Sequence, residues 1–196
     1  DKPNIRDFQF MVSDGLLFAH DPVRDMECRV EYPDPKALFY RLYCTDKQNR
    51  YEISQDIFTH PTDQALIIHI TYAALVPEAK AFHLYGLLNP HIDNSGAGDK
   101  VRLVKYKDCH IFLSYENGIY CALTCARGFK TYSCGFVGVN DGYSLLKQHY
   151  TIPENKAFTR ARYGNISLFF EIDLTEKDDE YVVIGFGHNE KSALDT

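Results

Sequence analysis

The chain has 196 residues, of which 45% are hydrophobic and 24% are charged. This length and composition fit one globular domain with a sizeable core. The formal net charge of −6 argues against nucleic acid as a partner, because phosphate binding needs a basic surface. No stretch approaches the ~18 consecutive apolar residues of a membrane span, so no membrane partner is expected either.

The dominant hydrophobic period is two, the period of β-strands. In residues 24–32, for example, Met26, Cys28, Val30 and Tyr32 alternate with charged residues, which predicts a half-buried strand. Similar patterns recur at hairpin spacing along the whole chain. The predicted strands are residues 24–32, 37–44, 50–59, 65–75, 81–88, 101–106, 109–115, 118–125, 131–139, 165–174 and 181–186.

Turn signals separate these strands, and only one helix is expected. The step Asn117-Gly118 is typical of a tight hairpin. Residues 141–150 predict the single short helix, with Asp141 as its N-cap, and residues 188–196 are expected to form a polar tail. No internal boundary is visible. The pattern therefore predicts one all-β domain over residues 1–196, a two-sheet sandwich or barrel with at most one short helix.

Six cysteines allow fifteen pairings, so the sequence cannot fix a connectivity. The spacing of Cys121 and Cys125 puts both on one face of a strand, too far apart to bridge along it. Buried, reduced thiols are the expectation for all six cysteines. With no visible signal peptide, this favours the cytoplasm over secretion, although the compartment stays open.

The longest polar connection runs from Asn89 to Lys100 and is the candidate site. Its sequence matches neither a calcium-binding loop nor a phosphate-binding loop, so a turn-rich connection is the simpler interpretation. A loop of this length is still more often functional than a short one, and here it would contact a neighbouring domain or a ligand. The candidate residues of this interdomain or ligand loop are Asn89, His91, Asp93, Asn94 and Asp99.

No other motif indicates chemistry. The eight histidines are scattered, which argues against a metal site. The Gly-x-Gly steps at residues 96–98 and 185–187 lack the strand and helix of a dinucleotide site. Glycoside hydrolysis needs two opposed carboxylates, and the sequence alone cannot select such a pair. The chain is therefore expected to carry no catalytic, cofactor or metal site of its own.

Five segments, in order along the chain, resemble prokaryotic glucoamylases of glycoside hydrolase family 15. The first, DKPNIRDFQFMVSDG, is similar to that family's early TPNIRDLQFLVTDG stretch. The others resemble its YRxxNTDxxGRY, LYxLLAPHLxNxGxGN and GYVGxSDGW segments and its closing strands, with Tyr143 where the family often has Trp. These segments are residues 1–15, 40–51, 84–98, 135–143 and 164–187.

The resemblance implies a galactose-mutarotase-like supersandwich that precedes an (α/α)6 barrel in the same polypeptide. That barrel holds the family's two catalytic glutamates, and no part of it is in this chain, so no catalytic residue can be carried over. The resemblance further implies that the first strands of the family domain lie before Asp1.

The leading expectation is thus a non-catalytic N-terminal domain that braces the barrel of a glucoamylase, an inverting enzyme that releases glucose from α-glucans. Three alternatives remain open. The chain could bind glycans by itself, for which it would need an exposed Tyr or Phe platform, since it has no Trp. It could be a sugar mutarotase, which only the shared fold suggests. It could also be an assembly domain that never touches sugar.

Overall fold

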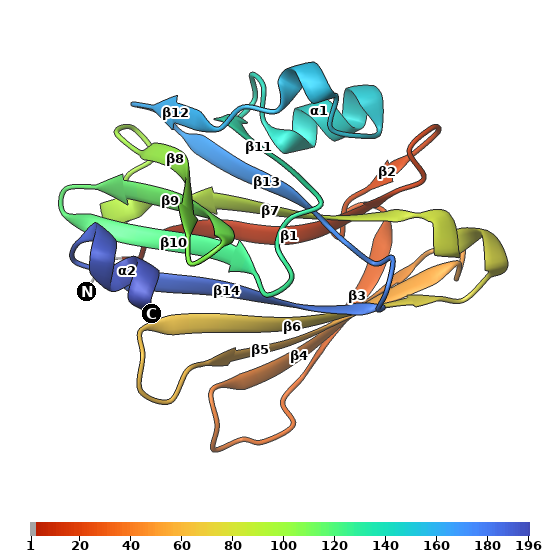
Figure 1. Ribbon diagram of the computed structural model, residues 1–196. Helices are drawn as coiled ribbons and strands as arrows, with labels where there is room; N and C mark the ends of the chain where they lie inside the picture. The colour runs from red at the N-terminus through yellow and green to blue at the C-terminus, as the bar shows by residue number, and fades with distance from the viewer. Residues whose placement is uncertain (1–2) are drawn as a thin grey trace.

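The computed structural model describes residues 3–196 as two antiparallel β-sheets stacked face to face (Figure 1). The smaller sheet has five strands in the order β11-β13-β7-β1-β2. Its strands are β1 (Ile5–Ser13), β2 (Ala19–His20), β7 (His83–Pro90), β11 (Thr131–Phe136) and β13 (Ile166–Ile172).

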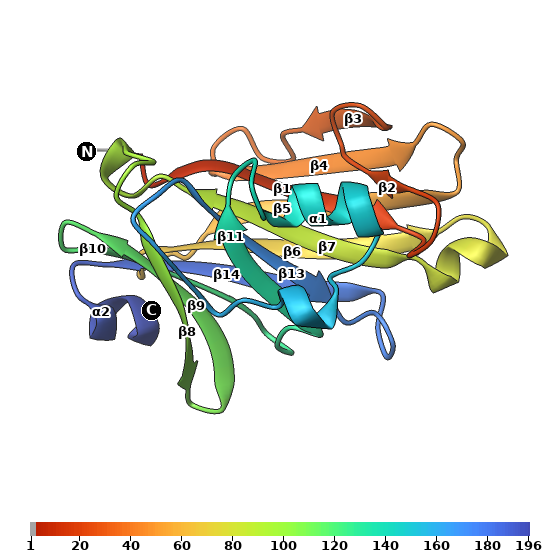
Figure 2. The same ribbon diagram turned by 90° about the horizontal axis from the view of Figure 1, so that it is seen from above.

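The larger sheet has nine strands in the order β12-β8-β9-β10-β14-β6-β5-β4-β3. Its strands are β3 (Met26–Glu31), β4 (Phe39–Asp46), β5 (Tyr51–Thr59), β6 (Ala65–Ala74), β8 (Lys100–Tyr106), β9 (Cys109–Glu116), β10 (Ile119–Cys125), β12 (Arg160–Arg162) and β14 (Asp179–Gly187). Seen from above, β3 and β4 lie at one margin, past β1 and β2 of the smaller sheet (Figure 2).

The main core lies between the sheets, because alternate residues of each strand face inward. From the smaller sheet, Phe10 and Phe170 enter this core, and from the larger sheet Ile70 and Phe112 meet them. All four are at most 2% exposed. The predicted two-sheet, all-β class is therefore confirmed.

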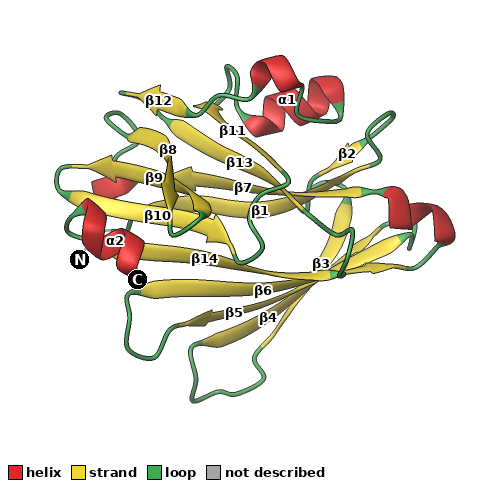
Figure 3. Cartoon of the chain, viewed as in Figure 1, coloured by secondary structure: helices red, strands yellow, loops and turns green. Residues whose placement is uncertain are grey.

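The helix α1 (Gly142–His149) covers the outer face of the smaller sheet (Figure 3). It begins where predicted, since the Asp141 side chain accepts a hydrogen bond from the Ser144 amide at 2.7 Å. Leu146 is fully buried against Tyr85 and Phe169. No helix among residues 3–196 has the length and hydrophobicity needed to span a membrane.

The prediction of a polar tail after His188 is wrong, because this segment forms a second short helix, α2 (Glu190–Asp195). Asn189 and Ser192 form a reciprocal capping box that starts α2. Ala193 then packs on Leu113 and Ala122 at the outer face of the larger sheet. A charged sequence with one buried alanine gives too weak a pattern to predict such a short helix.

All eleven predicted strands are present, with ends shifted by a few residues, and β1, β2 and β12 complete the sheets. The strand predicted over residues 131–139 stops at Phe136, whose amide is bound by the Asn140 side chain at 2.8 Å. The half-burial predicted for residues 24–32 is also wrong. Met26 is 4% exposed, but Val30 is 52% exposed and Tyr32 66%, because β3 is an edge strand.

The expectation of six reduced thiols is wrong for one pair. Cys28 of β3 lies directly opposite Cys44 of β4, and the two form a disulfide with an S–S distance of 2.04 Å. The pairing depends on the register between two strands, which cysteine spacing does not determine. The other four cysteines are free, including Cys121 and Cys125, as predicted.

Candidate functional site

The candidate loop is hydrogen-bonded to residues near the start of β1. β7 ends at Pro90, and a single 3₁₀ turn, η2 (Ile92–Asn94), carries the chain towards β8. Asp93 and Asn94 adopt left-handed backbone angles (φ of 59° and 60°), a conformation that Asp and Asn tolerate better than most residues. The Asp93 amide donates to Asn4 Oδ1 at 2.9 Å, and the His91 amide donates to the Asn4 carbonyl at 3.3 Å. The loop is therefore a fixed feature of the surface.

The five candidate residues do not converge on one site. Asn89 donates to Asn165 Oδ1 at 2.9 Å, and Asp93 accepts from Asn117 Nδ2 at 3.2 Å. Asn94 is exposed, whereas Asn89, His91 and Asp93 are half-buried. Asp99 is fully buried, so its side chain cannot touch a partner. Its place in the loop is structural.

The side chain of buried Asp99 contacts the half-buried carboxylate of Glu116. Burial raises the pKa of Asp99 to about 7, although the Ile92 amide, which donates to Oδ1 at 3.2 Å, opposes this rise. The Glu116 carboxylate adds to the increase. Asp99 Oδ2 and Glu116 Oε2 are buried and receive no hydrogen bond from the described residues. Below about pH 7, a proton on Asp99 would supply the missing donor between the two carboxyl groups.

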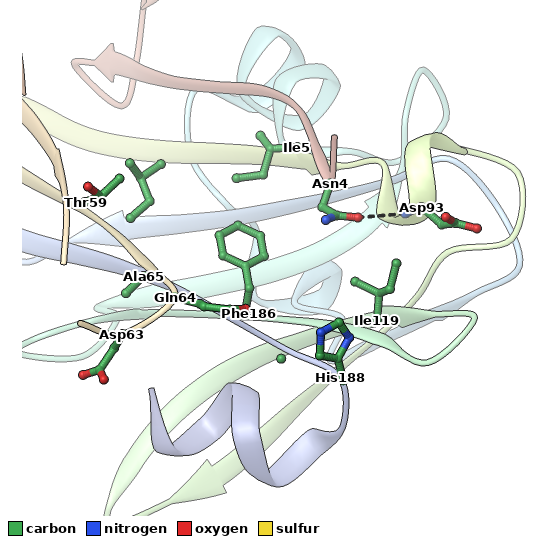
Figure 4. A pocket seen from close by; sticks show the side chains of 12 residues that line it. Asn4, Ile5, Thr59, Asp63, Gln64, Ala65, Asp93, Ile119, Phe186 and His188 are labelled. Atoms are coloured by element: carbon green, nitrogen blue, oxygen red, sulfur yellow. Dashed lines mark hydrogen bonds between the residues drawn. The ribbon is translucent and has the colours of Figure 1, made fainter. Parts of the chain in front are cut away.

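A cavity of about 770 Å³ opens beside the loop, at the end of the sandwich where the two sheets separate (Figure 4). Its apolar side chains come from both sheets, and Phe186 and Ile119 stand close to Ile5 across the opening. Polar side chains surround this apolar part. They are Asn4, Thr59, Asp63, Gln64, Asp93 and His188.

A second cavity of about 420 Å³ lies on the outer face of the smaller sheet, beside the start of α1. Asn89 and Tyr143 both line it. The candidate loop thus starts at one cavity, with Asn89, and reaches the other with Asp93.

The outer face of the smaller sheet also carries a histidine–carboxylate pair. His83 Nδ1 lies 2.8 Å from Glu171 Oε1, and Lys130 Nζ lies 2.8 Å from the same oxygen. Hydrogen bonds from His83 and Lys130 overcome the effect of burial and lower the pKa of Glu171.

Among residues 3–196, no group of three or more His, Cys, Asp or Glu side chains is arranged to hold a metal ion. Sequence reasoning did miss one surface feature, an exposed pair of aromatic side chains. The rings of Tyr32 and Tyr40 pack edge to face with their centres 5.4 Å apart, and the side chains are 66% and 39% exposed. Their alternation with polar residues is the pattern of a buried face, so it concealed their exposure.

Comparison with known proteins identifies the domain. Residues 1–196 match the family described as glucodextranase, domain N. A glucoamylase from Clostridium sp. (strain G0005) is 32% identical over 197 residues, which cover 99% of this chain and 27% of the relative.

The comparison with solved structures also finds a bacterial glucoamylase. A bacterial glucoamylase crystallised with acarbose superposes with a TM-score of 0.93 at 32% identity, over 98% of this chain and 28% of the other. A family 92 glycosyl hydrolase, at 8% identity and a TM-score of 0.54 over 94% of this chain and 25% of its own, shares the fold alone. The chain spans about a quarter of the length of the relatives it matches. It belongs to the glucodextranase domain N family and is an N-terminal β-sandwich domain of the glucoamylase type.

Proposed function

We propose that this domain is non-catalytic and braces the catalytic (α/α)6 domain of the same polypeptide. The parent would be an inverting glycoside hydrolase that releases glucose from the non-reducing ends of α-glucans. One observation carries the proposal: the similarity extends over 99% of this chain but over only 27% of a glucoamylase. The remaining three quarters of such a polypeptide would hold the chemistry.

The carboxylates of the domain support a non-catalytic role. An inverting glycosidase needs two carboxyl groups about 6.5–9.5 Å apart, with room for a sugar and a water between them. Asp99 and Glu116 instead contact each other, and Asp99 is fully buried. Glu171 is 5% exposed and is held by His83 and Lys130.

The candidate loop is our proposed contact with the catalytic domain, through its exposed residues Asn94 and Ala97. The hydrogen bonds from His91 and Asp93 to Asn4 fix the loop before any partner binds. A surface that is already ordered loses little conformational entropy on docking, which favours a stable contact between domains.

A bulky residue placed on this surface tests the proposal in the full-length parent. We expect Ala97→Arg to lower the unfolding temperature of the catalytic domain, because the new side chain would separate the docked surfaces. The isolated domain should keep its stability, since Ala97 is exposed. Gln48→Arg is the matched control, because Gln48 is exposed in the turn between β4 and β5, outside the candidate loop. If both variants unfold like the wild-type parent, the loop is not the contact.

A further inference from the structure

The inner face of the larger sheet is not covered along its whole length. Met26 and Cys44 lie on this face at one end of β3 and β4 and are at most 4% exposed. Towards the other end the same face becomes open, with Val30 at 52% and Tyr40 at 39% exposed. In Figure 2, β3 and β4 extend past β1 and β2, which agrees with this loss of cover.

The exposed Tyr32–Tyr40 pair lies beside the large cavity on this same face. Tyr40 of β4 is opposite Ile57 of β5. Two residues further along β5, and therefore on the same side of the sheet, Thr59 is opposite Leu66 of β6. Thr59 and Leu66 both line the cavity. The aromatic pair and the cavity thus lie next to each other on one face of the sheet, and we call this combined surface the inner groove.

The chemistry of the inner groove restricts what can bind there. Two carboxylates, Asp63 and Asp93, stand at the cavity, and none of the lining residues within 3–196 is a Lys or Arg. This disfavours phosphates and other anions. A wholly apolar ligand would strip water from the carboxylates and amides without replacing their hydrogen bonds. A ligand with apolar faces and many hydroxyl groups meets both needs.

We propose that the inner groove binds a neutral linear oligosaccharide. One pyranose ring stacks on Tyr32, which Tyr40 supports edge to face, and a ring further along the same oligosaccharide enters the cavity against Phe186. There its hydroxyl groups exchange hydrogen bonds with the Asn4 amide and the Asp63 carboxylate. A few polar groups placed around an aromatic floor are typical of small-molecule sites. Titration of the isolated domain measures this binding apart from the docking of the catalytic domain, and only the choice of an α-glucan as first probe rests on the proposed function.

The test is a titration of the isotope-labelled chain with maltopentaose, followed by amide NMR shifts, with cellopentaose in parallel. We expect saturable shifts at Tyr40, Ile119 and Phe186. Tyr32→Ala and Tyr40→Ala should each weaken binding roughly three- to tenfold, because the first removes the stacking surface and the second removes the ring that supports it. Both side chains are exposed, so both variants should fold. Tyr163→Ala, 70% exposed at the far edge of the larger sheet, should bind like the wild type.

Two results would overturn the proposal. One is the absence of saturable shifts with either sugar at ~10 mM, a concentration that detects even weak sites. The other is binding by the isolated domain that the full-length parent lacks, since the groove would then be covered by another part of the polypeptide. Neither result bears on the Ala97→Arg experiment, so failure of sugar binding and failure of docking can be told apart.

Discussion

The carboxyl groups of Asp99 and Glu116 contact each other at the start of the β8–β9 ladder, one position beyond the pair formed by Lys100 and Tyr115. Asp99 is 0% exposed. Two ionised carboxylates cannot coexist at such a place without a neutralising proton or cation. This contact makes the candidate loop sensitive to pH.

We predict that Asp99→Asn makes the domain more stable than the wild type at pH 8. The pKa of Asp99 rises from 3.8 to about 7 on folding, so its protonated form stabilises the fold below about pH 4. That contribution decreases progressively as the pH rises from about 4 to 7, by about 3 kcal/mol between pH 5 and pH 8. Asparagine keeps a donor for Glu116 and an acceptor for the Ile92 amide at every pH. Urea unfolding at both pH values measures the difference, and equal pH dependence in the two proteins would refute the shared proton.

The disulfide gives a second prediction. Thiol titration of the unreduced, unfolded chain should find four reactive thiols. Reduction should cost about 3 kcal/mol of unfolding free energy, the order expected for closing a loop of this length. A Cys28→Ala, Cys44→Ala double variant should be insensitive to reductant. Six reactive thiols in the unreduced protein would contradict the pairing. The disulfide itself removes the expectation of reduced thiols on which the cytoplasmic location was based.

His20 should titrate below its usual pKa of 6.5. Burial lowers the pKa of His20 and outweighs the nearby carboxylates of Asp25 and Asp46. Its Nδ1 lies 2.9 Å from the Tyr51 hydroxyl. As the pH falls from 6.5 towards the lowered pKa, the His20 ring becomes protonated in the unfolded chain before it does so in the folded chain. Over this range His20 should therefore reduce the free energy of unfolding. NMR titration of the His20 ring measures the midpoint, and a value above 6.5 would show that the carboxylates dominate instead.

Leu146 should be the main attachment of α1. Its side chain is 0% exposed and packs between the helix and the smaller sheet. Leu146→Ala should lower the free energy of unfolding by about 2–5 kcal/mol, the range for a leucine truncated in a packed core. Gln148→Ala, on the exposed side of the same helix, should change it little. Equal losses in the two variants would mean that α1 does not depend on this contact.

The sequence predicts the positions of the strands well, but it does not predict which strand faces are buried by the opposite sheet. The long apolar run over residues 65–75 predicts a central strand and locates β6 to within one residue of its end, since β6 lies inside the sheet between β14 and β5. The alternation in β3 suggests burial, yet Val30 and Tyr32 are exposed. Whether a face is covered depends on how far the opposite sheet extends, and this is a property of the assembled fold.

In the candidate loop, too, the sequence does not predict which side chains are buried. The length and polarity of the loop identify residues 89–99 as unusual, but they do not separate exposed Asn94 from buried Asp99. That difference depends on the pairing of β8 with β9, which brings Glu116 opposite Asp99. The Cys28–Cys44 pairing likewise depends on the register between β3 and β4.

Hydrogen–deuterium exchange, compared between the isolated domain and the full-length parent, tests the proposed bracing role most directly. If the domain docks through its candidate loop, the amides of residues 92–98 should exchange at least about tenfold more slowly in the parent, as a local stabilisation of 1.4 kcal/mol requires. Equal exchange throughout residues 3–196 in the two proteins would mean that the domain does not brace the catalytic domain.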